Sequence, residues 1–191
     1  VLDNYEGSVY LVWGFQDWNV DPYHAFPTFG MLNDAGIHTR AIIGQWAHNY
    51  PDQPDRHGDL SSGYGQEAYP NMTRMDWAVE LYNWFNYYLK GIGDEPTAIA
   101  QVQTNDGHWH AEETWPPEDL EWHNTPLSEV DSQGASVSAT ASASFTIPSF
   151  EEDIQISGMP TLHIEVNSGF CANGGQIFAT MYDDENGLRL G

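Results

Sequence analysis

An aspartate and a histidine follow two short apolar runs of the chain, and residues of these types can share a proton. Asp17 comes shortly after the run Ser8–Trp13, and His48 comes shortly after the run Thr39–Ile43. A carboxylate that accepts from one ring nitrogen of a histidine fixes its tautomer, and the other nitrogen can then take a proton from a nucleophile. Asp17 and His48 are therefore candidates for the acid and the base of a hydrolase triad.

The elements around these two residues predict that they meet. The run Ser8–Trp13 is too short for a helix and rich in β-branched and aromatic residues, which indicates a buried strand, and Thr39–Ile43 is predicted as a second buried strand. Between them Asp21-Pro22 begins a helix that ends near Ala35, and Pro27 should kink this helix or delay its start. A strand, a helix and a strand in succession predict a βαβ unit. Because parallel strands end at one edge of a sheet, we expect Asp17 and His48 to lie together there.

The rest of the chain predicts a long loop, a second helix and a second domain. Residues 51–71 are rich in Pro, Gly, Asp and Ser, which predicts a long loop, and loops of this length inside a domain are usually functional or mobile. From Met75 to Leu89 apolar residues recur at steps of three and four, which predicts an amphipathic helix closing at Gly91.

The texture of the sequence changes near residue 95. Short β-rich stretches follow with turn residues and no helices between them, which is typical of an antiparallel sandwich. We therefore expect one domain in residues 1–95 and a second, incomplete all-β domain in residues 96–191. The predicted strands are Ala98–Gln103, Glu121–Leu127, Val137–Ile147, Thr161–Val166 and Gln176–Tyr182.

Four motifs follow one another along the chain: Gly14–Val20, Gly44–His48, Trp84–Ile92 and Trp115–Pro117. Their order and spacing resemble the C-terminal portion of the peptidase S15 family, which includes Xaa-Pro dipeptidyl-peptidases and cocaine-esterase-like acyl hydrolases. The resemblance implies the C-terminal part of an α/β-hydrolase domain, with its parallel sheet, followed by a truncated jelly-roll sandwich. It also implies a substrate that is a peptide with proline second from the amino end, or a small ester or amide.

By this resemblance Asp17 is the triad acid and His48 is the general base. Trp18, Asn19 and Trp46 lie beside them in sequence, where they either bind the substrate's acyl group or pack beneath it. No cofactor is expected.

The nucleophilic serine is not at its expected place. The nucleophile elbow G-x-S-x-G should precede the acid in this chain order, and only Ser8, within the first predicted strand, precedes Asp17. Ser61, Ser62 and Ser128 come later. We expect the serine and the oxyanion donors to lie upstream, in a longer protein of which this chain is a fragment. The alternative is a non-catalytic β-sandwich module for binding or structure, attached to a degenerate hydrolase domain.

The charge of the chain excludes several classes of partner. Its 191 residues include 28 acids and 5 bases, which gives a formal charge of −23. Nucleic acids and anionic lipids need clustered Lys and Arg, so neither is an expected partner. The acids are dispersed along the chain, and this composition resembles that of proteins from salt-loving microbes. No apolar run is long enough to cross a bilayer. A homo-oligomer, a cytoplasmic location and export all remain open.

Other residues could bind a metal but lack a complete ligand set. His108-Trp109-His110 places two imidazoles on one face of a strand, and His57 lies near two aspartates. No third and fourth ligand follows at a known spacing, so we expect no metal site. Asp183–Gly187 lacks the pattern of an EF-hand and predicts a turn, and Cys171 has no nearby histidine, which favours a structural thiol.

Overall fold

The computed structural model describes residues 2–17, 19–53, 68–125, 145–163, 178–185 and 187. The chain divides into two compact units, Val1–Glu118 with Gly158–Gly191, and Asp119–Ser157. Among the described residues no helix is both long and apolar enough to span a membrane. The described elements are the 3-10 turn η1 (Leu2–Asn4), β1 (Val9–Gly14), α1 (Pro22–Asp34), β2 (Thr39–Gly44), α2 (Trp77–Lys90), β3 (Ala100–Gln103) and β4 (Trp109–Glu112).

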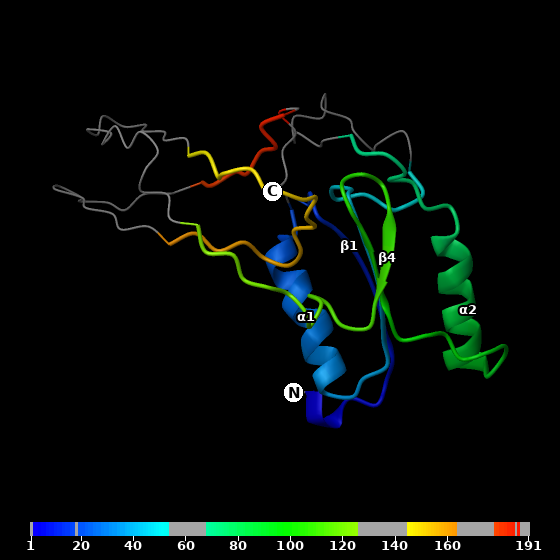
Figure 1. Cartoon of the computed structure of the whole chain (residues 1–191). Helices are drawn as coiled ribbons and strands as arrows, with labels where there is room; N and C mark the ends of the chain where they lie inside the picture. Colours follow the sequence, from blue (N-terminus) through cyan, green and yellow to red (C-terminus); the bar gives the residue numbers. More distant parts are fainter. Residues whose placement is uncertain are drawn as a thin grey trace, which may run out of the picture. The chain divides into compact units, whose positions relative to one another are not determined.

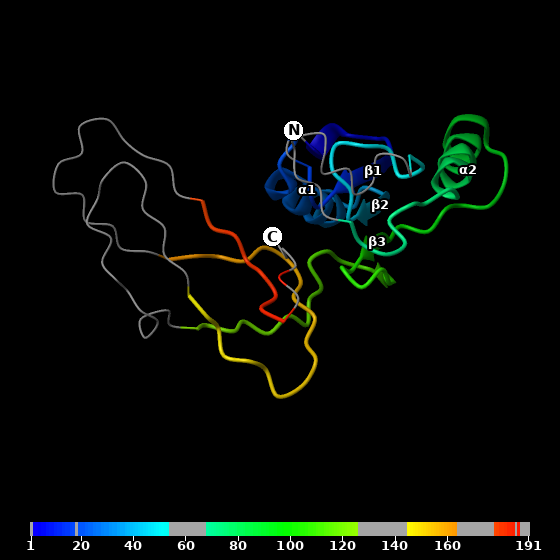
Figure 2. The same cartoon turned by 90° about the horizontal axis from the view of Figure 1, so that it is seen from above.

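The first unit contains a mixed four-stranded sheet with a helix on either face. The strand order is β1-β2-β3-β4, and the pairs β1–β2 and β2–β3 are parallel while β3–β4 is antiparallel. Figures 1 and 2 show the sheet between α1 and α2. The predicted βαβ unit is confirmed, and its two strands have the predicted positions.

Local sequence signals account for the start of α1. The carboxylate of Asp21 accepts a hydrogen bond from the backbone N–H of Tyr23 at 2.8 Å, and Pro22 occupies the first turn. Both features stabilise a helix start, because the first N–H groups of a helix have no partner within it. The helix begins at Pro22 and continues through Pro27, so this proline does not delay its start.

Alternate residues of β2 supply two separate cores. Ala41 and Ile43 pack with Phe26 and Phe29 of α1 in the first core. Ile42 belongs to the second core on the opposite face, where Trp77 of α2 is packed against it. Successive side chains of a strand point to opposite faces, so an uninterrupted apolar run can fill both layers.

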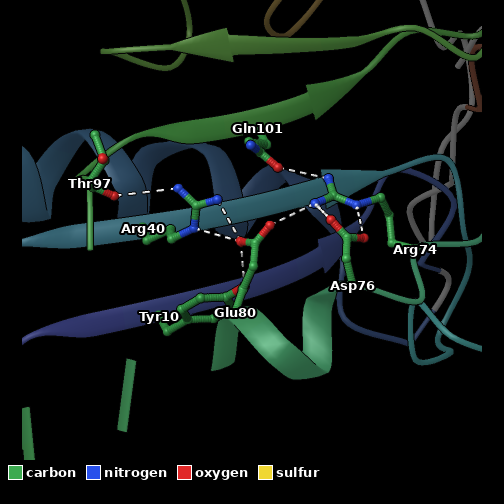
Figure 3. A network of polar contacts seen from close by, with 7 residues as sticks. All are labelled: Tyr10, Arg40, Arg74, Asp76, Glu80, Thr97 and Gln101. Atoms are coloured by element: carbon green, nitrogen blue, oxygen red, sulfur yellow. Dashed lines mark hydrogen bonds and ion pairs between the residues drawn. The ribbon is translucent and has the colours of Figure 1, made fainter. Parts of the chain in front are cut away.

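A network of charged side chains attaches α2 to the sheet (Figure 3). Glu80 of α2 accepts from Nε of Arg40 at 2.8 Å through Oε2, and from Nη2 of Arg74 at 2.8 Å through Oε1. Arg40 lies on β2, and the Arg74 guanidinium also lies 4.6 Å from the Trp109 ring centre on β4. The network therefore links α2 with strands on both sides of the sheet centre.

Three neighbours complete this network. The hydroxyl of Tyr10 donates to Glu80 at 3.3 Å, and burial, followed by the negative charge of Glu80, raises the pKa of Tyr10. Arg74 donates to both oxygens of Asp76 at 2.7 and 2.8 Å, which lowers the pKa of that carboxyl. Arg74 also donates to Gln101 of β3 at 2.7 Å. Every charged group in the network therefore has an opposite partner.

The first sheet continues past residue 95, where we expected a second domain to begin. The predicted strand Ala98–Gln103 appears as β3, but it pairs with β2 in parallel and does not start a separate sandwich. The physical reason is that α2 serves as a crossover from β2 to β3, as α1 does from β1 to β2.

The jelly-roll sandwich stays a prediction. The described residues 121–125, 145–147, 161–163 and 178–181 contain no strand, and Tyr182 forms only a single bridge. The remaining residues of the later predicted strands lie outside the described ranges. The structure thus establishes a small unit with a mixed sheet and two helices.

Candidate functional site

The loops after β1 and β2 are joined at the carboxyl edge of the sheet. The register pairs Gly14 with Gly44, so the two strands end side by side. The backbone N–H of Phe15 donates to the carbonyl of Gly44 at 2.8 Å, and that of Gln16 donates to the carbonyl of Trp46 at 3.1 Å. These two backbone hydrogen bonds hold the loops together without any contribution from side chains.

Asp17 and His48 are in direct contact across these loops. Nδ1 of His48 lies 2.9 Å from Oδ2 of Asp17. The other oxygen, Oδ1, accepts the backbone N–H groups of Asn19 at 2.8 Å and of Val20 at 2.9 Å. The Asp17 side chain is only 9% exposed, whereas that of His48 is 50% exposed. The carboxylate is therefore fixed and enclosed, and the imidazole that it holds remains accessible.

Asn19, one of the three residues predicted to bind the substrate, lies next to His48. Its side-chain nitrogen Nδ2 lies 3.5 Å from Nε2 of His48, the ring nitrogen that does not face Asp17. The structure thus brings Asp17 and His48 together, as the sequence predicted, and Asn19 lies beside them, while its role in substrate binding stays a prediction. The prediction for Trp18 falls outside the described residues.

Trp46 lies in the second core. Its side chain is 1% exposed and packs with Ile42 and Met72, and its ring centre is 5.8 Å from that of Trp109. A side chain so fully covered offers no surface to a bound molecule. Of the two predicted roles for Trp46, the structure shows packing beneath the loop that carries His48.

The position of Trp46 explains the glycines that end both strands, Gly14 and Gly44. A Cβ atom at Gly44 would lie 2.1 Å from a ring carbon of Trp46, and one at Gly14 would lie 2.1 Å from the Trp46 carbonyl oxygen. Real Cβ atoms do not approach other atoms so closely. Both positions therefore require glycine for the loops to pack as they do.

Comparisons of the chain with protein-family models, with curated proteins and with solved structures find no match. The resemblance to the peptidase S15 family therefore stays a prediction from motifs. Function has to be argued from the geometry of Asp17 and His48 and from the residues that position them.

A second aspartate–histidine pair lies in the hairpin between β3 and β4. Nδ1 of His108 is 2.7 Å from Oδ2 of Asp106, and both side chains are exposed. Hydrogen bonds from the Thr104 hydroxyl and from His108 hold the pKa of Asp106 well below its usual range. All of these partners belong to the same turn, so this pair stabilises the hairpin locally.

The metal alternatives receive no support from the described part of the chain. It contains no group of three or more His, Cys, Asp or Glu side chains that could hold an ion. His57 and Cys171 lie outside the described residues. Asp183 accepts from the backbone N–H of Glu185 at 2.9 Å and from that of Gly187 at 2.8 Å, which is the predicted turn.

A surface pocket of about 580 Å³ lies away from Asp17 and His48. Arg40, Glu80 and Thr97 contribute to its wall. Arg40 is near the amino end of β2 and Thr97 precedes β3, whereas Asp17 and His48 follow the carboxyl ends of their strands. The pocket and the Asp17–His48 pair are therefore at opposite edges of the sheet, and the pair is the better candidate site.

Proposed function

We propose that this chain supplies the acid and the base of a serine hydrolase, with Asp17 and His48 in these two roles. The observation that carries the proposal is the 2.9 Å contact between His48 Nδ1 and Asp17 Oδ2. Two further features support it: the carboxylate is enclosed and held by two backbone N–H groups, and the imidazole is half exposed. An acid and a base placed after neighbouring parallel strands are the arrangement that α/β hydrolases use.

The chemistry assigns one task to each nitrogen of His48. Asp17 accepts the Nδ1–H hydrogen bond, so Nε2 has the lone pair that takes the proton of a serine hydroxyl. The serine oxygen then forms a bond to the acyl carbon of the substrate. As the bond from that carbon to the leaving nitrogen or oxygen breaks, Nε2 returns the proton to the leaving group. In the second half of the reaction a water molecule gives a proton to Nε2 and its oxygen bonds to the acyl carbon. The bond from that carbon to the serine oxygen breaks, Nε2 returns the proton to the serine, and the acyl group leaves as a carboxylic acid.

In the chain order of α/β hydrolases the nucleophile of this scheme precedes the acid, and Ser8 is the serine that precedes Asp17 in this sequence. Ser8 immediately precedes β1, and Asp17 and His48 follow the opposite ends of β1 and β2. The strand length between them keeps the Ser8 hydroxyl away from His48. A serine on the carboxyl side of another parallel strand has the required position, as in other hydrolases of this class.

The proposed substrates are peptides with proline as the second residue, or small esters and amides. Both contain an acyl carbon that a serine can attack, and the motifs of the chain resemble a family that acts on both. Asn19, beside His48 Nε2, is placed to contact the substrate near the reacting carbonyl.

The decisive experiment uses the full-length protein in molar salt and a fluorophosphonate probe. We expect one serine to be labelled, and we expect the His48→Ala variant to lose labelling, because the hydroxyl then has no base. His108→Ala is the matched control: it removes the imidazole of the Asp106–His108 pair, whose partners all belong to one hairpin. This variant should be labelled at the wild-type rate.

The same experiment separates the two functions that the sequence allows. Labelling that survives His48→Ala would overturn the assignment of the base. Absence of labelling in the folded wild-type protein would instead favour the non-catalytic β-sandwich module. If labelling occurs, release of proline-containing dipeptides or of a small ester's acid identifies the substrate class.

A further inference from the structure

Three glutamines, one from each parallel strand or its loop, form a continuous hydrogen-bonded row beneath the candidate site. Gln16 follows β1, Gln45 follows β2, and Gln103 is the last residue of β3. Nε2 of Gln16 donates to the carbonyl of Gln45 at 2.7 Å. The side chain of Gln45 donates in turn to the carbonyl of Gln103 at 3.0 Å. The row therefore crosses the carboxyl edge of the sheet at the level of Asp17 and His48.

Gln103 is the anchor of this row, because it is 1% exposed and uses both ends of its amide. Its oxygen Oε1 accepts from the backbone N–H of Gln45 at 3.1 Å. Its nitrogen Nε2 donates to the carbonyl of Pro70 at 2.9 Å. An amide is both a donor and an acceptor, so no carboxylate or hydrocarbon of similar size can make both bonds.

These bonds act on the residue at which the catalytic loop begins. Gln45 is the first residue after β2, and His48 follows on the same short loop. Gln45 is held at its backbone N–H and at its side chain by one partner, Gln103, and at its carbonyl by Gln16. Because Gln103 is buried and both ends of its amide are bonded, it has few alternative arrangements, so it fixes the start of the loop at Gln45.

We propose that Gln103 is a positioning residue for His48, acting through Gln45. It touches neither the base nor the acid, but it determines where the loop of the base leaves the sheet. The importance of this for catalysis rests on the proposed function, because it requires His48 to be the base. The positioning itself does not, since the contact of His48 with Asp17 can be measured without any substrate.

The test compares Gln103→Glu and Gln103→Met with Gln101→Glu. A glutamate at position 103 can still accept from Gln45 but cannot donate to Pro70 when ionised, and a methionine can make neither bond. Gln101→Glu is the matched control, because Gln101 lies two residues earlier on the same strand and therefore on the same face. The amide oxygen of Gln101 accepts a hydrogen bond from Arg74, and Arg74 can donate to a glutamate carboxylate at this position equally well.

Nitrogen NMR of histidine-labelled protein reports the two ring nitrogens of His48, and every measurement is made well below the unfolding temperature of the variant concerned. In wild type and in Gln101→Glu we expect Nδ1 to be protonated and bound to Asp17. In both Gln103 variants we expect this signal to shift or broaden. In the full-length protein the rate of fluorophosphonate labelling should fall about tenfold to 100-fold, because small displacements of a catalytic group have effects of this size.

Two further outcomes decide the matter. If either Gln103 variant does not fold, Gln45→Met replaces it: this partly buried side chain loses its bond to the Gln103 carbonyl, and a smaller change in the same His48 signals is expected. Unchanged His48 signals in folded variants overturn the proposal, whatever the activity. Absence of labelling in wild type would remove the proposed hydrolase function and leave the NMR result to decide the positioning alone.

Discussion

Nδ1 of His48 lies 2.9 Å from Oδ2 of Asp17, although 31 positions separate the two residues in the chain. The contact spans two loops that start from the paired ends of β1 and β2. The surrounding residues fix the geometry of this contact. Two backbone N–H groups donate to the second oxygen of Asp17, and Trp46 packs beneath the loop that carries His48. Strand register and loop packing therefore position the candidate site, and the Asp17–His48 contact depends on both.

Asp17→Asn should nearly abolish the proposed activity while the protein stays folded. The amide would donate where the carboxylate accepts, which favours the wrong tautomer of His48 and removes the charge that stabilises its imidazolium. We expect kcat to fall about 10³- to 10⁴-fold, measured on a small ester in the full-length protein. Asp21→Asn is the control, because it keeps the cap of α1 and should leave kcat unchanged. Equal activity of both variants would contradict the role of Asp17.

Most of the first unit was predictable because its signals are local. Ser8–Trp13 and Thr39–Ile43 are short stretches rich in β-branched residues and each is followed by a glycine, and Asp21-Pro22 is a cap with a first-turn proline. Each of these patterns acts within a few residues, so each can be found in the sequence alone. The meeting of Asp17 and His48 then followed from one topological rule, that parallel strands end at the same edge.

The choice of partner strand was not predictable in the same way. The stretch Ala98–Gln103 has the pattern of a strand, but nothing within it says that it pairs with β2 in parallel. Similarly, Gln103 is a single amide with no motif around it, and its value arises only from Gln45 and Pro70, which are far away in sequence. The spacing of apolar residues in α2 predicts the helix but does not predict that Glu80 binds Arg40 and Arg74.

Glu80→Gln should destabilise the first unit, because it leaves Arg40 and Arg74 without the carboxylate that joins them. The two guanidinium groups are mostly buried and the carboxylate is about one quarter exposed. We expect a loss of about 2 kcal/mol in the free energy of unfolding, below the value for a fully buried pair. Urea unfolding measures it. Glu6→Gln, at an exposed position, should change the free energy by less than about 0.5 kcal/mol, and an equal effect of both variants would contradict the network's role.

Asp76 should make stability depend on pH through its contact with Arg74. The hydrogen bonds from Arg74 lower the pKa of Asp76 in the folded state below its ordinary value of 3.8. A group with a lowered folded pKa stabilises the protein above its unfolded pKa, and this contribution is lost as the pH falls through the folded pKa. Asp76→Asn should therefore lower the urea midpoint at pH 7, and the difference from wild type should shrink below pH 3.8.

A double variant provides the control for this pH dependence. In an Arg74→Met background the Asp76 carboxylate has lost its main partner, so adding Asp76→Asn should produce little further pH-dependent change. If the difference persists unchanged in that background, its cause is not the bond to Arg74.

Salt should stabilise the whole chain. With a formal charge of −23 the dispersed carboxylates repel one another, and raising the ionic strength from 0.1 M to 1 M shortens the Debye length from about 10 Å to about 3 Å. The urea midpoint should therefore rise with potassium chloride. A triple variant, Glu151→Gln, Glu152→Gln and Asp153→Asn, removes three exposed acids and should show a weaker rise. A midpoint that is independent of salt would contradict repulsion as the cause.

Gly44→Ala should disturb the site more than its size suggests. The added Cβ would lie 2.1 Å from a ring carbon of Trp46, a buried side chain that cannot turn aside, so the loop toward His48 has to move. We expect a loss of about 1–3 kcal/mol in the free energy of unfolding and a weakened Asp17–His48 contact by nitrogen NMR. Gly30→Ala is the matched control with the opposite sign. Gly30 lies within α1 and its Cβ would meet nothing closer than 3.8 Å, so this variant should gain about 0.4–1 kcal/mol and leave His48 unchanged. If Gly44→Ala leaves both the stability and the His48 signals intact, Trp46 does not set the position of the loop.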